Sequence, residues 1–455
     1  MSVVRFILKG EDQETVFNPI RAKEYGMVLY GKSSDGKELR IPLKQEDGIF
    51  ILKGENPFEE DEAVVNERLL GLSQEWLDTE NSGLEASFED DYTYGKPGYS
   101  PDDIYVESKP FSIPQLIQFI EDGDIEISPN FQRNFVWDRT RKSRLIESIF
   151  LGLPLPSIYF SQYKDGRLAI VDGLQRLHTI DEFYHNELRL SNLEYLVECN
   201  GCTYKELEGK LSPLRLRRFK QTQIMGFVID YRSPSALKFD LFKRLNTGGK
   251  PLNAQEIRNC MSRPGLQKTL HNMVSCDEFI KATDGSVSDV RMAAQELALR
   301  FIYFYDQYDV ANPIGNYSGR IDDELNNFID FLNSQRQGEL DNYCELFKTG
   351  LRSAYRIFHR FAFRKIDIDY QSARRTPINK LLFTTITVIF ARHATDYEKK
   401  LRLFQQSDTQ VMDSLAQLIN DDKSFFSALT WSTNAKWNFE YVYGKLKNLF
   451  DSYLL

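Results

Sequence analysis

The sequence predicts a mixed α+β fold, in which a small N-terminal β module, a central α/β domain and an all-helical C-terminal domain follow one another. Short strand-like runs separated by turn residues fill the first part of the chain. Strand and helix patterns alternate from Phe111 onward, and helical periodicity alone continues after Asn253. The expected domains are 1–53, 109–260 and 261–455, with an acidic linker at 54–108.

Composition excludes two classes of protein. A hydrophobic content of 42% supports packed cores and excludes wholesale disorder. No stretch approaches the roughly twenty apolar residues that a membrane-spanning helix needs. Five cysteines in 455 residues do not make a disulfide framework, which favours a reducing compartment. We therefore expect a cytoplasmic protein without a membrane partner.

The β module is predicted from four short apolar runs with turns between them. The turns are expected at Gly10, at 34–36 and at Asp47-Gly48. The expected strands are Val3–Leu8, Met27–Tyr30, Leu39–Ile41 and Ile49–Leu52.

The expected linker concentrates the negative charge of the chain. Between Glu55 and Asp103 there are fifteen acidic residues and two basic ones, so the rest of the chain has 55 basic and 51 acidic residues. The remainder can therefore present basic surface to phosphate despite the overall charge of -9. A solvated linker with a short helix around Val65–Trp76 is the favoured interpretation. An acidic decoy or regulatory segment over a basic cleft stays open.

The central domain carries clear helix and strand signals. Ser112 is placed to cap a helix, and Asp138 or Thr140 opens the next one, which stops at Gly152. Asn253 begins a capping-box pattern. The remaining expected elements are strands at Ser157–Ser161, Arg167–Val171 and Ile224–Tyr231, a helix from Gly173 and a helix at Pro234–Leu245.

The run Asp172-Gly-Leu-Gln-Arg176 is the sharpest candidate site. A strand enters a tight turn and continues directly as a helix, so the free N–H groups of the first helical turn point at one place. Gly173 would let backbone approach an anion, and Arg176 could clamp a phosphate. Asp172 could hold Mg²⁺ or orient a water. The alternative is a plain capping box formed by Asp172 and Gln175, with Arg176 simply reaching a nearby carboxylate.

Two further clusters could complete a pocket. In 129–137, Gln132 and Arg133 are polar residues between apolar ones. Arg133 would be a second phosphate clamp and Trp137 or Phe135 a base-stacking surface, unless the aromatic residues there are simply core. In 242–249, Arg244, Asn246 and Thr247 could contact a nucleotide or its metal, although an ordinary helix C-cap explains the glycines equally well.

These clusters together resemble one family. The motifs appear in the order and spacing of the N-terminal domain of GmrSD-type restriction endonucleases, a domain related to ParB and sulfiredoxin. The motifs are Ile113-Pro-Gln-Leu-Ile117, Pro129-Asn-Phe-Gln-Arg133, Trp137, Leu145-Ile-Glu-Ser148, Gly152-Leu-Pro-Leu-Pro156, Val171-Asp-Gly-Leu-Gln-Arg176 and Phe242-Lys-Arg-Leu-Asn-Thr-Gly-Gly249.

The resemblance implies binding of a nucleoside triphosphate of unknown identity with Mg²⁺, and hydrolysis in several members. Carried onto this sequence, it gives Asp172, Gln175 and Arg176 as catalytic residues, with Asp172 also as the metal ligand. The expected nucleotide contacts are Gln132, Arg133, Gly173, Arg244, Asn246 and Thr247. The family favours Gln where this chain has Leu174, which puts hydrolysis in more doubt than binding.

The nuclease half of GmrSD enzymes has no counterpart that we recognise here. An HNH-type site needs clustered His and Asn or Asp ligands, and the five histidines show no such spacing. Two hypotheses follow. One is an NTP-binding, hydrolysing component of a prokaryotic restriction or anti-phage system that acts on or senses DNA. The other is a DNA-binding or scaffold module with a vestigial pocket that regulates a partner nuclease.

Two weaker patterns complete the analysis. Cys199-Asn-Gly-Cys202 is an isolated C-x-x-C pair, which we interpret as coincidence because no second pair completes a zinc site. Four arginines from Arg352 to Arg364 recur at every fourth residue, which predicts a basic stripe along one helix. The stripe could contact DNA phosphates or pair with carboxylates elsewhere in the fold.

Overall fold

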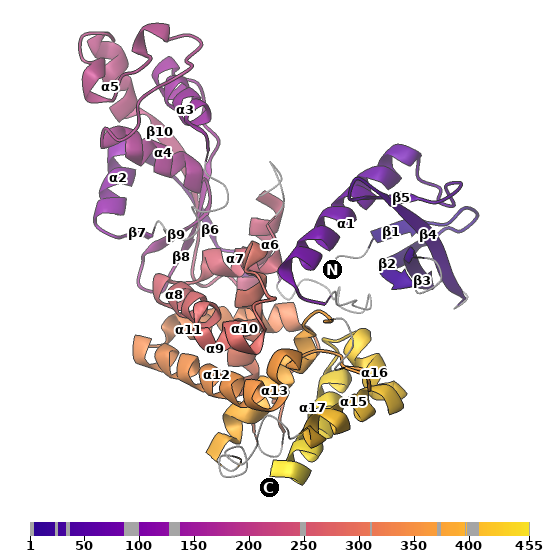
Figure 1. The fold of residues 1–455 in the computed structure, drawn as a ribbon. Helices are drawn as coiled ribbons and strands as arrows, with labels where there is room; N and C mark the ends of the chain where they lie inside the picture. Colours follow the sequence, from indigo (N-terminus) through magenta and orange to yellow (C-terminus); the bar gives the residue numbers. More distant parts are fainter. Residues whose placement is uncertain are drawn as a thin grey trace. The chain divides into compact units, whose positions relative to one another are not determined.

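The computed structural model describes residues 4–22, 26–32, 37–85, 100–126, 137–245, 252–309, 312–370, 375–395, 397 and 409–454. The chain forms two compact units. Residues 1–95, 268–328 and 334–455 make up the first unit, and residues 96–267 and 329–333 make up the second. The mixed α+β fold that the sequence predicts is confirmed (Figure 1).

The first unit begins with an antiparallel five-stranded meander. Its strands are β1 (Val4–Ile7), β2 (Glu14–Ala22), β3 (Gly26–Lys32), β4 (Glu38–Glu46) and β5 (Ile49–Leu52), hydrogen-bonded in that order. Strand β2, which contains Pro19, was not among the expected strands. Among the described residues, β1 pairs with Glu14–Phe17, so Pro19 lies outside this pairing.

Helix α1 (Glu62–Ser82) covers this sheet and contacts β1 and β5. Its buried side chains pack with Phe6, Phe17, Phe50 and Phe58 of the β module; they are Val65, Leu69, Leu72 and Trp76. This part of the expected linker is therefore a packed helix rather than a solvated segment. The helix expected around Val65–Trp76 forms and is longer, and its narrow apolar face packs against the sheet. The domain boundaries remain a prediction.

The helical part of the first unit centres on α13 (Lys380–Arg392), whose residues Leu381–Ala391 are all buried. It contacts α10, α12 and α17. The elements around it are α8 (Pro264–Ser275, which begins in the second unit), α9 (Asp277–Ala282), α10 (Ala293–Asp306), α11 (Ile321–Ser334), α12 (Gln337–Phe358), α15 (Gln410–Asp421), α16 (Lys423–Thr430) and α17 (Lys436–Leu454). Among the described residues, no helix has both the length and the hydropathy to cross a membrane.

The second unit is built on a mixed sheet with strand order β6-β10-β8-β9-β7. Its strands are β6 (Val106–Ser112), β7 (Ile125–Glu126), β8 (Ile158–Gln162), β9 (Leu168–Asp172) and β10 (Gln223–Ile229). Its helices are α2 (Ile113–Glu121), α3 (Arg139–Leu151), α4 (Leu174–Tyr184), α5 (Pro213–Gln221), α6 (Ser235–Leu245) and α7 (Ala254–Met261). The strands and helices expected between Phe111 and Leu245 all form, with ends that differ by one or two residues.

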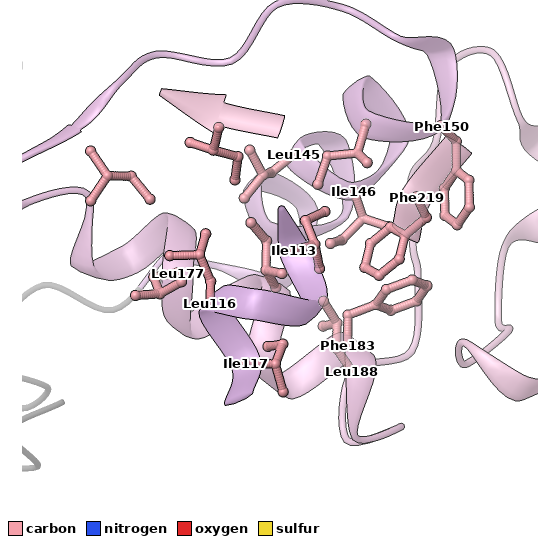
Figure 2. Close-up of a cluster of buried hydrophobic side chains, with 14 of the residues drawn as sticks. Ile113, Leu116, Ile117, Leu145, Ile146, Phe150, Leu177, Phe183, Leu188 and Phe219 are labelled. Atoms are coloured by element: carbon pink, nitrogen blue, oxygen red, sulfur yellow. The ribbon is translucent and has the colours of Figure 1, made fainter. Parts of the chain in front are cut away.

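One hydrophobic core joins α2, α3, α4 and α5 to the sheet. Figure 2 shows side chains from all four helices meeting there, including Leu116, Ile146, Phe183 and Phe219. The helix starts behave as the sequence predicts. Ser112 accepts a hydrogen bond from the backbone N–H of Gln115, and Asp138 accepts one from Arg141. This core fixes β9 and α4 against each other, and the candidate site lies at their junction.

Candidate functional site

The turn between β9 and α4 is as sharp as the sequence predicts. Asp172 ends the strand, Gly173 has φ +101°, and Leu174 is the first helical residue. A Cβ on Gly173 would lie 2.9 Å from a side-chain carbon of Ile158 and 3.2 Å from Nη2 of Arg176. Glycine is therefore required here both by the backbone conformation and by the close approach of β8.

No side chain caps the start of α4. The N-cap position is Gly173, and no side-chain hydrogen bond is made to the first turn. The capping-box alternative for Asp172 and Gln175 is therefore wrong. Among the described residues, no side chain accepts a hydrogen bond from the first-turn N–H groups, so this end of the helix keeps its donors and its positive potential.

Asp172 and Arg176 face each other across the first helical turn. Nη2 of Arg176 donates to Oδ2 of Asp172 at 2.5 Å. Nη1 of Arg176 donates to the carbonyl oxygens of Pro156 and Ser157, the latter at 2.9 Å. The side chain of Arg176 is 12% exposed and that of Asp172 is 30% exposed. Within the described parts of the chain, Oδ1 of Asp172 accepts no hydrogen bond, so it remains available for a metal ion or a water.

Gln175 connects the turn to the second cluster. Its Oε1 accepts a 3.2 Å hydrogen bond from the backbone N–H of Trp137. The half-buried Trp137 packs against the core and carries the guanidinium of Arg141 over its ring, at 4.6 Å from the centroid. Gln132 and Arg133 lie outside the described residues.

The third cluster is only partly described. Arg244 lies in the last turn of α6 and is exposed. Helix α6 contacts β9, as does α7. Asn246 and Thr247 lie outside the described residues, so the structure does not test the ordinary C-cap alternative. Leu174, where the family favours Gln, is half-buried and packs against the hydrophobic core.

A row of three polar side chains beyond the turn was missed by sequence reasoning. Nζ of Lys142 lies 2.6 Å from Oε2 of Glu182, and Oε1 of Glu182 lies 3.5 Å from Nδ1 of His178. The i,i+4 spacing of His178 and Glu182 on α4 was the available signal. Lys142 and Glu182 line an open cavity of about 480 Å³, whose walls also include Trp137 and Arg189.

Neither weaker sequence pattern forms a site. Cys199 and Cys202 are buried free thiols in the hydrophobic core, and burial raises the pKa of Cys199 to about 11. Over the described ranges no three His, Cys, Asp or Glu residues are placed to hold a metal ion.

The predicted stripe of four arginines on one helix is wrong. Helix α12 ends at Phe358, so Arg360 and Arg364 lie beyond it. Arg364 is 2% exposed and donates to the carbonyl oxygens of Arg360, Thr376 and Thr283. It is therefore not available to DNA.

Comparison with known protein families gives one match. Residues 113–262, from the first residue of α2 to the end of α7, match the model described as the N-terminal domain of GmrSD restriction endonuclease. The match confirms the resemblance that the sequence motifs predict. Neither the curated proteins nor the solved structures contain a match to this chain.

Proposed function

We propose that this chain, which carries a GmrSD-type N-terminal domain, is a cytoplasmic component of a restriction or anti-phage defence system that senses or acts on DNA. Its β9–α4 turn binds a nucleoside triphosphate with Mg²⁺. The observation that supports this most strongly is the uncapped start of α4. Its first-turn N–H donors follow Gly173, which has no side chain to keep a phosphate away from the backbone. Phosphate oxygens are well suited to such donors.

The remaining groups have distinct parts in this proposal. Arg176 adds a guanidinium beside Gly173, and its three acceptors hold it in one position. Asp172 offers Oδ1 to the metal ion. A single carboxylate is a sufficient protein contribution for Mg²⁺, because phosphate oxygens and water complete its coordination. The bound metal ion would neutralise charge on the phosphates.

The cavity beside Trp137 supplies room for the base and sugar. Its volume of about 480 Å³ lies within the range of small-ligand sites. Gln175 holds Trp137 next to the turn, so one nucleotide could contact both places. Trp137 provides the aromatic surface that a base requires.

A second candidate function is a DNA-binding or scaffold module in which the turn serves only the fold. The saturation of Arg176 favours it, because a guanidinium already bonded to Asp172 and two carbonyls has few donors left for phosphate. Leu174 favours it as well, because a core side chain stands where the family has a polar one.

Phosphate release from ATP, GTP and CTP, with and without Mg²⁺, separates the two. In the first proposal, Asp172→Ala abolishes Mg²⁺-dependent turnover. Asp165→Ala is the matched control, because Asp165 is a carboxylate in the turn that precedes the other end of β9 and pairs there with Arg167. Turnover at the parental rate in Asp172→Ala would exclude the assigned metal or water role.

A further inference from the structure

The end of helix α12 has an unusual backbone. His359 follows the last residue of α12 and has φ +48°, in the region that favours glycine, yet it carries a side chain. The chain then makes a short 3-10 turn at His359–Phe361. Strained positions of this kind persist where the surrounding structure holds them, often beside binding sites. The turn redirects Arg360 away from the line of Arg352 and Arg356.

This turn forms one wall of an open cavity of about 610 Å³, a size typical of small-ligand sites. The opposite wall is the end of α9 and the loop that follows it, with Lys281, Asp284 and Gly285. Met412 of α15 and Tyr370 also line the cavity. All these residues belong to the first unit.

Buried Arg364 joins the two walls. It donates to the carbonyl oxygen of Arg360 on one side, at 3.0 Å. On the other side it donates to the carbonyl oxygen of Thr283 at 3.1 Å and to Oγ of Ser286 at 2.7 Å. These bonds fix the loop that carries Asp284 and Gly285 relative to the turn that carries Arg360. The cavity is therefore preorganised, which lowers the entropic cost of binding a ligand.

The cavity is positively charged. Among the described residues, Lys281 and Arg360 have no carboxylate partner within ion-pair distance, and Arg364 contacts only carbonyl and hydroxyl oxygens. Asp284 is the acidic residue of the lining, and Arg375 lies 2.5 Å from its Oδ2. The lining therefore favours an anion.

The cavity also offers aromatic surfaces. Tyr355 is 40% exposed, and its ring meets that of His359 edge-on at 5.8 Å. Phe361 carries the guanidinium of Arg360 over its ring, 4.8 Å from the centroid. Exposed aromatic rings beside cations are the combination that single-stranded nucleic acids require, because bases stack on rings while phosphates contact the cations.

We propose that this cavity binds one nucleotide unit, a planar base joined to phosphate, with the base on Tyr355 and the phosphate on Lys281 and Arg360. The unit can come from single-stranded DNA or from a free mononucleotide. This site lies in the helical part of the first unit and is independent of the β9–α4 turn.

The test is fluorescence anisotropy of a labelled short oligothymidine, measured with the full chain in the absence of NTP and Mg²⁺. The parent protein binds the single strand more tightly than a duplex of the same length. Tyr355→Ala weakens single-strand binding about tenfold, as expected for loss of one stacked base. Lys281→Ala/Arg360→Ala lowers the slope of log affinity against log salt by about 0.7, the contribution of the one phosphate that both cations contact.

Matched controls keep the result specific. Arg320→Ala/Lys423→Ala makes the same change in charge at exposed positions of the first unit outside the cavity lining and retains parental binding. Asp172→Ala also retains parental binding of the single strand. Loss of single-strand binding and loss of NTP turnover are therefore separate outcomes. Competition by free dTMP identifies a mononucleotide site, and competition by oligonucleotide alone identifies a polymer site. Equal affinity for duplex, or unchanged binding in Tyr355→Ala, overturns the proposal.

Discussion

Nη2 of Arg176 donates to Oδ2 of Asp172 at 2.5 Å, which fixes the guanidinium beside Gly173 at the start of α4. The same guanidinium holds the carbonyl oxygens of Pro156 and Ser157, which lie just before β8. The candidate site therefore depends on one arginine that joins the turn to the preceding loop.

Arg176→Ala should destabilise the second unit by about 2 kcal/mol, because it leaves two carbonyl groups and a partly buried carboxylate without their donor. Chemical denaturation followed by circular dichroism measures the change. Arg167→Ala is the control, since Arg167 pairs with Asp165 in the turn before β9 and its side chain is 38% exposed. Equal stability of the two variants would mean that Arg176 does not brace the loop.

Gly173→Ala should lower the free energy of unfolding more than Gly166→Ala does, although both glycines have positive φ. Nothing lies within 4 Å of a Cβ on Gly166, so that substitution costs only the backbone strain of about 1–2 kcal/mol. At Gly173 the new Cβ also overlaps Ile158, which adds about 1–3 kcal/mol. Thermal unfolding of both variants gives the difference, and equal losses would contradict the close approach of β8.

Glu147→Ala should destabilise the second unit by about 3 kcal/mol. The carboxylate of Glu147 is buried and accepts backbone N–H groups from Glu194, Tyr195 and Leu196, at 2.7–3.2 Å. Without it these donors lose their acceptor. Glu194→Ala removes a half-exposed carboxylate and serves as control. Denaturant unfolding curves that coincide for the two variants would contradict this role.

Asp422→Asn should make the free energy of unfolding less dependent on pH in the acidic range. Hydrogen bonds from Lys445 and from the backbone N–H of Phe425 lower the pKa of Asp422 to about 2. Because this pKa is below the unfolded value of about 3.9, the stabilisation is present above pH 4 and is lost as pH falls through the folded pKa. The free energy of unfolding should therefore be higher for the parent than for Asp422→Asn at pH 7, and the difference should be smaller at pH 2.5.

Asp422→Ala separates the cap from the charge. Asparagine can still cap α16, whereas alanine cannot, which costs about 1 kcal/mol further at every pH. A gap between parent and Asp422→Asn that stays constant with pH would contradict the lowered pKa.

Local patterns predicted the elements around the site because their causes are local. Ser112, Asp138 and the Asn253 capping box each act within one helical turn. The contact of Arg176 with a nearby carboxylate was one of the alternatives open from the sequence, and it forms with Asp172. The carbonyl contacts of Arg176 and the backbone contacts of Glu147 could not be predicted, because those partners lie about 20 and 48 residues away in sequence. The predicted arginine stripe was wrong because periodicity gives no sign of the turn at His359.

The most direct test of the central claim is calorimetric binding of ATP, GTP and CTP, each with Mg²⁺, to the parent protein, Arg176→Ala and Arg167→Ala. The account predicts that at least one nucleotide binds the parent and Arg167→Ala, and that Arg176→Ala loses this binding. If the folded parent protein binds none of the three, the turn is a structural brace and the proposed nucleotide site is contradicted.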